Sequence, residues 1–200
     1  LFVISSPSGG GKTSLINKLF EDSRSTNFEK IISDTSRKKR QGDLEGKDYY
    51  FLSEKDFKDK IKKEEYVEYA TVFGNFYGTS KEEIKTKYNN SNLILELDWQ
   101  GAYAVKEIFD DAKLIFLVPP SLDELKQRLI KRNLDSSETV EIRLSEAKKE
   151  ISKSEMYDYL VLNDDFHKAF EDLSQILFEG ISPIDFNSRA TKDLIKRLVE

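Results

Sequence analysis

The fold is decided by the stretch LFVISSPSGGGKTSLINKLF, residues 1–20. It begins with LFVIS, a short run that is apolar and β-branched up to Ile4, as in a buried strand, and a Ser/Pro/Gly cluster follows. The next apolar residues recur at the spacing of one helix face: Leu15, Ile16, Leu19 and Phe20. The stretch therefore predicts a strand, a tight glycine loop and a helix in direct succession.

This succession is the context that a phosphate-binding loop, or P-loop, requires. Three consecutive glycines at 9–11 let backbone N–H groups turn toward phosphate oxygens, and the helix start adds positive potential. In such loops Lys12 reaches the β- and γ-phosphates, and Thr13 can ligate Mg²⁺. Ser6 stands where the motif GxxxxGK[ST] has its first glycine, so a flexible glycine turn with an exposed lysine is the alternative. The context favours a nucleoside triphosphate site.

Strands and helices alternate along most of the chain. Apolar runs that stop at acids, prolines or polar residues predict parallel strands at 92–98, 113–120 and 157–163, and a further strand is expected at 28–35. Helical spacing follows at 101–112, 121–132, 136–156 and 164–179. This order predicts an α/β fold of three layers around a central parallel sheet.

The segment from about residue 33 to 90 interrupts this alternation. It contains a charged loop, a helix at 54–64 that Ser53 opens with a capping box, a hairpin around Gly74, and a helix that Thr79 or Ser80 caps. We expect one domain over 1–200, with an inserted α+β subdomain at 33–90 and a helical lid at 121–143. Its core would comprise 1–32, 91–120 and 144–180, followed by a tail at 181–200.

Composition limits the class of partner. The 200 residues include no cysteine, which excludes disulfides and thiolate metal sites and suits a reducing compartment. A net charge of −5 disfavours general nucleic-acid binding, and no apolar run approaches the roughly 20 residues of a membrane helix. We expect a soluble, cytoplasmic protein that binds neither nucleic acid nor membrane, and the oligomeric state stays open. Because Leu1 is first, a short natural N-terminal segment is expected before it.

Six motifs occur in the order in which the guanylate kinase family has them: ISSPSGGGKTS, SDTSRKKRQGDLEGKDYYF, VEYATVFGNFYGTS, LELDWQG, RLIKRNLDSSETVEIRL and LVLNDDF. The chain resembles the bacterial members up to about residue 180. The resemblance implies a cytoplasmic kinase of purine metabolism that transfers the γ-phosphoryl group of ATP to GMP, and to dGMP, giving ADP and GDP. Mg²⁺ would accompany ATP.

The resemblance implies a GMP site made of Ser33, Arg37, Arg40, Tyr49, Glu68, Tyr77, Thr79 and Asp98. The two arginines and two tyrosines would hold the phosphate, because guanidinium forks bind it bidentately and phenols add donors. Glu68 suits guanine, whose N1–H and N2–H₂ face an acceptor-only carboxylate, whereas adenine presents an unprotonated N1. The alternatives are a solvated cationic loop, core packing for the tyrosines and a solvent-facing acid at Glu68.

For the ATP side the resemblance implies Ser8, Gly9, Gly10, Gly11, Lys12, Thr13, Ser14 and Asn163. The residues that it implies for catalysis are Lys12, Arg37, Arg128, Arg132 and Arg143. No general base is needed, because the acceptor phosphate is already ionised near neutral pH, so His167 is expected on the surface. A salt bridge along its helix is the alternative for Arg143, and a helix cap is the alternative for Asn163.

Besides Ser6, two residues depart from the family's pattern. Glu96 stands where relatives often have aspartate and is expected to hold Mg²⁺ only through water, and Asn133 replaces a glycine of the lid. Two other functions compete: a guanylate-kinase-like binding module without catalysis, and a kinase whose acceptor is a sugar phosphate. The intact glycine loop disfavours the first, and Glu68 with the Ser33 and Thr79 hydroxyls disfavours the second.

Overall fold

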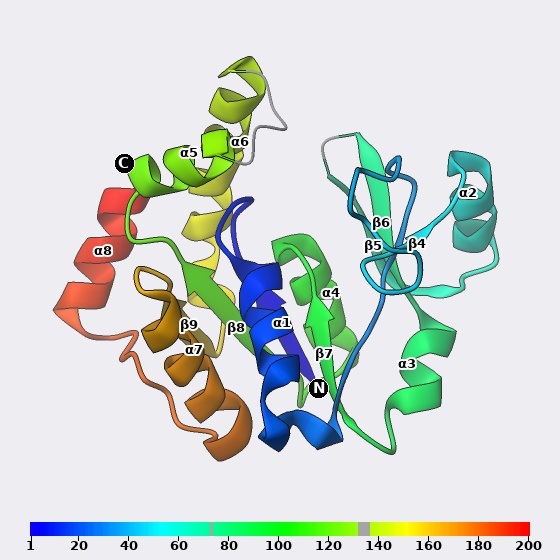
Figure 1. The fold of residues 1–200 in the computed structure, drawn as a ribbon, viewed down its shortest axis with the longest axis horizontal. Coiled ribbons are helices and arrows are strands. Elements are labelled where there is room, and N and C mark those ends of the chain that lie inside the picture. Colours follow the sequence, from blue (N-terminus) through cyan, green and yellow to red (C-terminus); the bar gives the residue numbers. More distant parts are fainter. Residues whose placement is uncertain (73, 132–136) are drawn as a thin grey trace. The chain divides into compact units, whose positions relative to one another are not determined.

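The computed structural model describes residues 1–72, 74–131 and 137–200. The chain forms two compact units (Figure 1). We call residues 2–26 and 113–200 the loop unit, because they include the glycine loop. Residues 27–112, with Leu1, are called the hairpin unit.

The loop unit is built on three parallel strands, β1 (Phe2–Ser5), β8 (Lys113–Val118) and β9 (Tyr159–Leu162). β8 pairs with β1 on one side and with β9 on the other, so Ile4 lies opposite Ile115 and Leu117 opposite Val161. These four side chains are fully buried. The strands predicted at 1–5, 113–120 and 157–163 are thus confirmed.

Among the described residues of the loop unit, these strands are accompanied by the α-helices α1 (Lys12–Glu21), α5 (Leu122–Lys131), α6 (Ser137–Ser152), α7 (Phe166–Ser174) and α8 (Arg189–Val199). α1 packs against α7, and α6 contacts both α5 and α8 (Figure 1). Ser121 caps α5 by accepting the Glu124 N–H at 3.0 Å. The single helix expected at 164–179 changes at Gln175 into a π-helical segment that ends at Glu179. Short 3₁₀ segments occur at Ser23–Asn27 and Ser154–Met156.

The hairpin unit contains a parallel pair, β2 (Phe28–Lys30) with β7 (Asn92–Glu96), and a mixed sheet. The mixed sheet has the order β4-β3-β6-β5, where β3 is Asp34–Thr35, β4 is Tyr50–Phe51, β5 is Tyr66–Val72 and β6 is Asn75–Ser80. Its helices are α2 (Glu54–Lys62), α3 (Lys81–Lys87) and α4 (Trp99–Ile108). The antiparallel β5–β6 pair confirms the predicted hairpin.

The single strand predicted at 28–35 is wrong, because the chain changes sheets within it. The Ile31 N–H still bonds to the Ile94 carbonyl beside β7, but the Ser33 carbonyl already accepts from Tyr50 in the mixed sheet. The apolar pattern of 28–35 is continuous, since Ile31 and Ile32 stay buried through the crossover. Periodicity reports burial, whereas the change of sheet depends on distant partners.

Helix caps follow the sequence only in part. Ser53 accepts the Asp56 N–H at 3.1 Å and donates to its carboxylate at 2.6 Å, which confirms the capping box of α2. Ser80 occupies the N-cap position of α3 without a side-chain cap bond. The Thr79 hydroxyl instead donates to Glu68. Ser80 thus begins α3 as one of the two expected N-cap residues, but the side-chain cap bond expected from Thr79 or Ser80 is absent.

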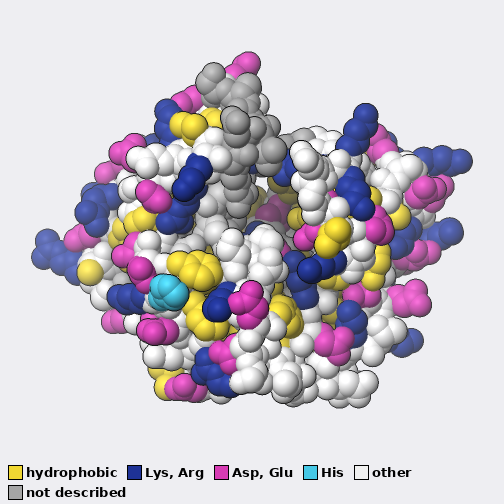
Figure 2. Space-filling model, in the orientation of Figure 1, with side chains coloured by type: hydrophobic (Ala, Val, Ile, Leu, Met, Phe, Trp, Pro, Cys, Tyr) yellow, Lys and Arg dark blue, Asp and Glu magenta, His cyan; other side chains and the backbone are white. Residues whose placement is uncertain are grey.

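The parallel strands form one sheet in the order β2-β7-β1-β8-β9. The predicted α/β class with a central parallel sheet is confirmed, and the structure adds a four-stranded mixed sheet. Across the described residues, no helix is long and apolar enough to span a membrane. Lysine and arginine side chains alternate with acidic ones on the face that Figure 2 displays.

Candidate functional site

The glycine loop has the backbone that its sequence requires. Gly11 is the N-cap of α1 and lies in the left-handed region, at φ 88° and ψ 8°. A Cβ at Gly10 would lie 2.8 Å from the Ser6 side chain and 2.9 Å from the Pro7 carbonyl oxygen, which accepts the Gly10 N–H. Ser6 is buried and its hydroxyl donates to that same carbonyl. A tight turn thus forms with serine in place of the motif's first glycine.

Asn163 joins this loop to the end of β9. Its side-chain amide donates to the Gly10 carbonyl at 2.7 Å, and its backbone N–H donates to Val118. Only 5% of Asn163 is exposed, and a Cβ at Gly11 would lie 2.4 Å from its Nδ2. Asp165, and not Asn163, caps α7 by accepting the Lys168 N–H. The helix-cap alternative for Asn163 is therefore wrong.

Two of the three predicted lid arginines lie among the described residues. Arg128 on α5 donates to the Asn163 carbonyl at 3.1 Å and pairs with Glu124 at 3.0 Å. Arg143 on α6 donates to the Ser8 hydroxyl at 3.1 Å, so it reaches the glycine loop. Arg132 and Asn133 lie outside the described residues. Two guanidinium groups therefore adjoin the loop that precedes Lys12, which is half-buried at the start of α1.

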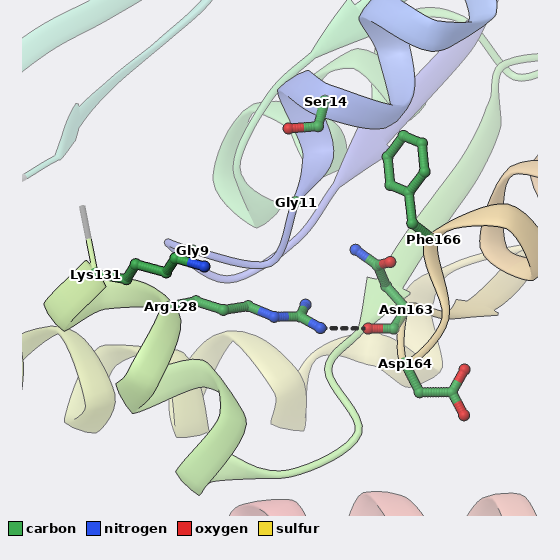
Figure 3. A pocket seen from close by; sticks show the side chains of 8 residues that line it. All are labelled: Gly9, Gly11, Ser14, Arg128, Lys131, Asn163, Asp164 and Phe166. Carbon is green, nitrogen blue, oxygen red and sulfur yellow. Dashed lines mark hydrogen bonds between the residues drawn. The ribbon is translucent and has the colours of Figure 1, made fainter.

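An open cavity of about 330 Å³ adjoins this loop (Figure 3). Its lining combines glycines, cations, polar groups and one aromatic ring: Gly9, Gly11, Ser14, Arg128, Lys131, Asn163, Asp164 and Phe166. Arg128 and Lys131 reach the cavity from α5, Asn163 reaches it from the turn after β9, and Phe166 reaches it from the start of α7 (Figure 3). Such a mixture suits a ligand with both a ring and phosphates.

One of the predicted acceptor residues in the hairpin unit, Glu68, is a buried acid. Glu68 on β5 is 6% exposed, so the solvent-facing alternative is wrong. Its Oε1 accepts the Thr79 hydroxyl at 2.5 Å, from directly across the β5–β6 pair. Burial raises the pKa of the Glu68 carboxyl from 4.5 to about 7, and the nearby Asp98 charge adds to the rise. When it is ionised, a buried carboxylate binds best to a ligand that offers hydrogen-bond donors.

Three of the side chains that are predicted to bind the acceptor phosphate, Arg37, Tyr49 and Tyr77, form an aromatic and cationic cluster. Arg37 pairs with Asp43 at 2.9 Å and lies over the rings of Tyr49 and Phe51. The Tyr49 and Tyr77 rings meet edge to face, with centroids 5.7 Å apart, and both are half-buried. Burial raises the pKa of Tyr49 far above its usual value, which keeps the phenol a donor. Packing and phosphate binding are therefore compatible for these tyrosines.

The remaining predicted acceptor residues differ in exposure. Ser33 is buried just before β3, whereas Arg40 is exposed and donates its backbone N–H to Asp43. Asp98 caps α4 by accepting the Gly101 N–H at 2.9 Å, a structural role that motif reading did not suggest. His167 is exposed, as expected.

Sequence reasoning missed one buried acid beside Ser33. Asp34 is 3% exposed and accepts hydrogen bonds from Tyr66 at 2.8 Å and from Lys60 at 2.5 Å. Its two partners come from β5 and α2, so no local spacing connects them to Asp34. The bonds tie α2 and β5 to the strand that follows Ser33.

Glu96, which is expected to bind Mg²⁺ through a water molecule, forms an ion pair within the protein. Its carboxylate pairs with Lys30 at 2.9 Å, and both side chains are largely buried. Among the described residues there is no group of three or more metal-ligating side chains. A Mg²⁺ that accompanies a nucleotide would keep water and phosphate oxygens as most of its ligands. Thr13, exposed in the first turn of α1, offers the hydroxyl that such an ion takes from a P-loop.

A parallel sheet with a glycine loop between its first strand and first helix defines the class of P-loop α/β proteins. The sequence model of the family described as guanylate kinase matches residues 1–180. A guanylate kinase of Wolbachia sp. subsp. Brugia malayi (strain TRS) is 45% identical over 179 residues, which are 88% of this chain and 91% of that protein. One of Francisella tularensis subsp. holarctica (strain LVS) is 44% identical, over 90% of this chain and 97% of that protein.

A crystal structure of guanylate kinase from Anaplasma phagocytophilum matches with a TM-score of 0.74 at 32% identity. The match covers 100% of this chain and 95% of that one. The chain belongs to the guanylate kinase family.

Proposed function

We propose that this chain transfers the γ-phosphoryl group of ATP to GMP, giving ADP and GDP. Glu68 carries the proposal: guanine presents N1–H and N2–H₂ side by side, and Glu68 is an acceptor-only carboxylate buried beside the Thr79 hydroxyl. Adenine, whose N1 is unprotonated, would offer the carboxylate no donor at that position, which costs about 10⁴-fold in comparable hydrogen-bonding sites. Family membership supports the same reaction.

The acceptor phosphate is bound by Arg37 and Arg40, with the hydroxyls of Tyr49 and Tyr77 as further donors. The contact of Arg37 with the Tyr49 ring and its pairing with Asp43 support this role, because they hold the guanidinium at the aromatic cluster. A phosphate that enters competes with Asp43 for the same guanidinium. Ser33, Thr79 and Asp98 complete the guanine side.

The donor triphosphate is bound by the glycine loop with Lys12 and Thr13. The bonds of Arg128 to Asn163 and of Arg143 to Ser8 support a role for both arginines in neutralising charge on the moving phosphoryl group. Arg132 is assigned to the same role by its motif alone. Mg²⁺, held by Thr13 and the phosphates, supplies further charge neutralisation when bound.

No residue has to remove a proton from the acceptor. The second pKa of a phosphate is about 6, so the attacking oxygen of GMP is already ionised at neutral pH. The chain's task is therefore to align two polyanions and to exclude water. Water-mediated metal binding by Glu96, dGMP as a second acceptor and a cytoplasmic location stay predictions.

Steady-state ADP release with GMP, dGMP, AMP, UMP and a ribose phosphate as acceptors tests this proposal. GMP should exceed AMP in kcat/KM by at least a thousandfold. Turnover of ribose phosphate in place of GMP would make the chain a sugar-phosphate kinase, and GMP binding without any transfer would make it a binding module.

Lys12→Ala tests the donor side. Transfer should fall by more than a hundredfold while GMP still binds, because Lys12 serves only the triphosphate. Lys18→Ala on the same helix is the matched control, since Lys18 makes a surface pair with Glu21. Similar activity of the two variants would contradict the assignment of the loop.

A further inference from the structure

Gly101 is a glycine that its own backbone does not require. It is the third residue of α4 and does not belong to the glycines with positive φ, so any residue can adopt its conformation. Alanine would favour the helix by about 1 kcal/mol over glycine at such a position. A reason for glycine must therefore lie in what surrounds it.

The space beside Gly101 is taken by Glu68. A Cβ at Gly101 would lie 2.9 Å from Glu68 Oε2, 3.2 Å from its carboxyl carbon and 3.3 Å from Leu97 Cβ. Gly101 is itself buried, and α4 packs against β5, the strand that carries Glu68. The carboxylate thus occupies the volume that a side chain at residue 101 would fill.

Neither side of this contact is free to shift. The Thr79 hydroxyl holds Glu68 Oε1 at 2.5 Å, and a register shift of the β5–β6 pair between Tyr66 and Glu68 brings Glu68 opposite Thr79. On the other side, Asp98 holds the Gly101 N–H at 2.9 Å and so fixes the first turn of α4. An added methyl group would displace the carboxylate from this position.

We propose that Gly101 is a positioning residue for guanine recognition: it leaves the space in which the Glu68 carboxylate is held for the acceptor base. The positioning role rests on the proposed function, whereas the contact between Gly101 and Glu68 does not depend on it. Gly101 lies against Glu68 and acts through it. Asp98 accepts the Gly101 N–H and so helps to fix Gly101 in this position.

A thermal double-mutant cycle tests the contact without any substrate. In a Glu68→Ala background, Gly101→Ala should raise the midpoint of unfolding by about 2–4 °C, because only the helix propensity of alanine remains. With Glu68 present, the same substitution should lower the midpoint. An equal rise in both backgrounds would overturn the inference.

If Gly101→Ala alone yields no folded protein, the paired variants decide. Recovery of folded protein in Gly101→Ala/Glu68→Ala or in Gly101→Ala/Glu68→Asp supports the proposal, because both shorten the side chain that collides. Failure of both pairs would show that the contact with Leu97 requires glycine, and would overturn the proposal.

Kinetics test the positioning itself. Gly101→Ala should raise the KM for GMP at least tenfold, while the KM for ATP and kcat at saturating GMP stay within about twofold. Tyr103→Ala, on the exposed side of the same helix, is the control and should leave all three constants unchanged. An unchanged KM for GMP would refute the positioning role. Wild-type protein that does not use GMP would refute the proposed function instead, while the thermal cycle would still report on the contact.

Discussion

At the scale of single residues, the acceptor side places an ionisable group where it weakens the fold. Glu68 is 6% exposed, yet the proposed reading of guanine needs its carboxylate form. Thr79 donates one hydrogen bond to it, but burial and the Asp98 charge still favour the protonated form. The proposed recognition of guanine by Glu68 would therefore lower the stability of the fold, as functional residues often do.

Glu68→Gln should stabilise the protein in a pH-dependent way. Below pH 4.5 the carboxyl is neutral in both the folded and the unfolded chain. As the pH rises to about 7, the unfolded chain loses the proton and the folded chain keeps it, so the wild type loses stability. The variant should thus gain about 3 kcal/mol over the wild type at pH 8 and almost nothing at pH 4.

Urea denaturation at pH 4, 6 and 8 measures this difference. Glu107→Gln, an exposed substitution on α4, serves as the control and should show no comparable trend. A stability difference for Glu68→Gln that does not grow with pH would contradict the raised pKa of Glu68. The variant should also lose GMP turnover, because one face of its amide donates where guanine donates.

At the scale of elements, the donor side depends on how one helix is held. α6 carries Arg143 to the glycine loop, and it contacts both α5 and α8 (Figure 1). α8 lies beyond residue 180, where the match to the family model ends. Its Leu198 is 3% exposed, and Lys148 of α6 donates to the backbone carbonyl of Glu200.

Leu198→Ala should lower the free energy of unfolding by about 2–4 kcal/mol, because it removes a buried side chain from α8. Lys192→Ala on the exposed side of the same helix should change it by less than about 0.5 kcal/mol. Thermal unfolding of the two variants measures both effects. Equal stability of the two would show that α8 does not support the loop unit.

At the scale of the whole molecule, the proposed transfer needs both units at once. Arg37 and Arg40 belong to the hairpin unit, whereas Lys12, Arg128 and Arg143 belong to the loop unit. The phosphates of GMP and ATP must meet for an in-line transfer, while the cations that bind them repel one another. Bound polyanions offset that repulsion, so both substrates together should draw the units together.

Paired fluorescent labels test this closure, and the absence of native cysteine makes specific labelling simple. Labels at Lys62→Cys in the hairpin unit and Glu138→Cys in the loop unit should approach each other when GMP and a non-hydrolysable ATP analogue are both present. A pair within the hairpin unit, Lys62→Cys with Lys85→Cys, should change little. An unchanged distance between the units with both ligands bound would indicate a preformed, rigid site.

The amino-acid sequence by itself determined the elements whose causes are local. A glycine run between a β-branched strand and an amphipathic helix predicts the P-loop, because backbone freedom and periodicity are encoded within a few residues. Apolar runs predicted the parallel strands, and Ser53 with Asp56 predicted the start of α2. The residues of both half-sites were assigned from motif order, through resemblance to one family.

Only the tertiary structure decided burial and partners. The segment 28–35 changes sheets instead of forming one strand, and the Asn163 side chain donates to the Gly10 carbonyl instead of capping a helix. Glu96 forms an ion pair with Lys30. The tertiary structure also placed Glu68 against Gly101, residues from a strand and a helix that are far apart in sequence. The physical reason is that a side chain's local pattern states whether it can be buried, whereas its pKa and its hydrogen bonds depend on groups that only the folded chain brings to it.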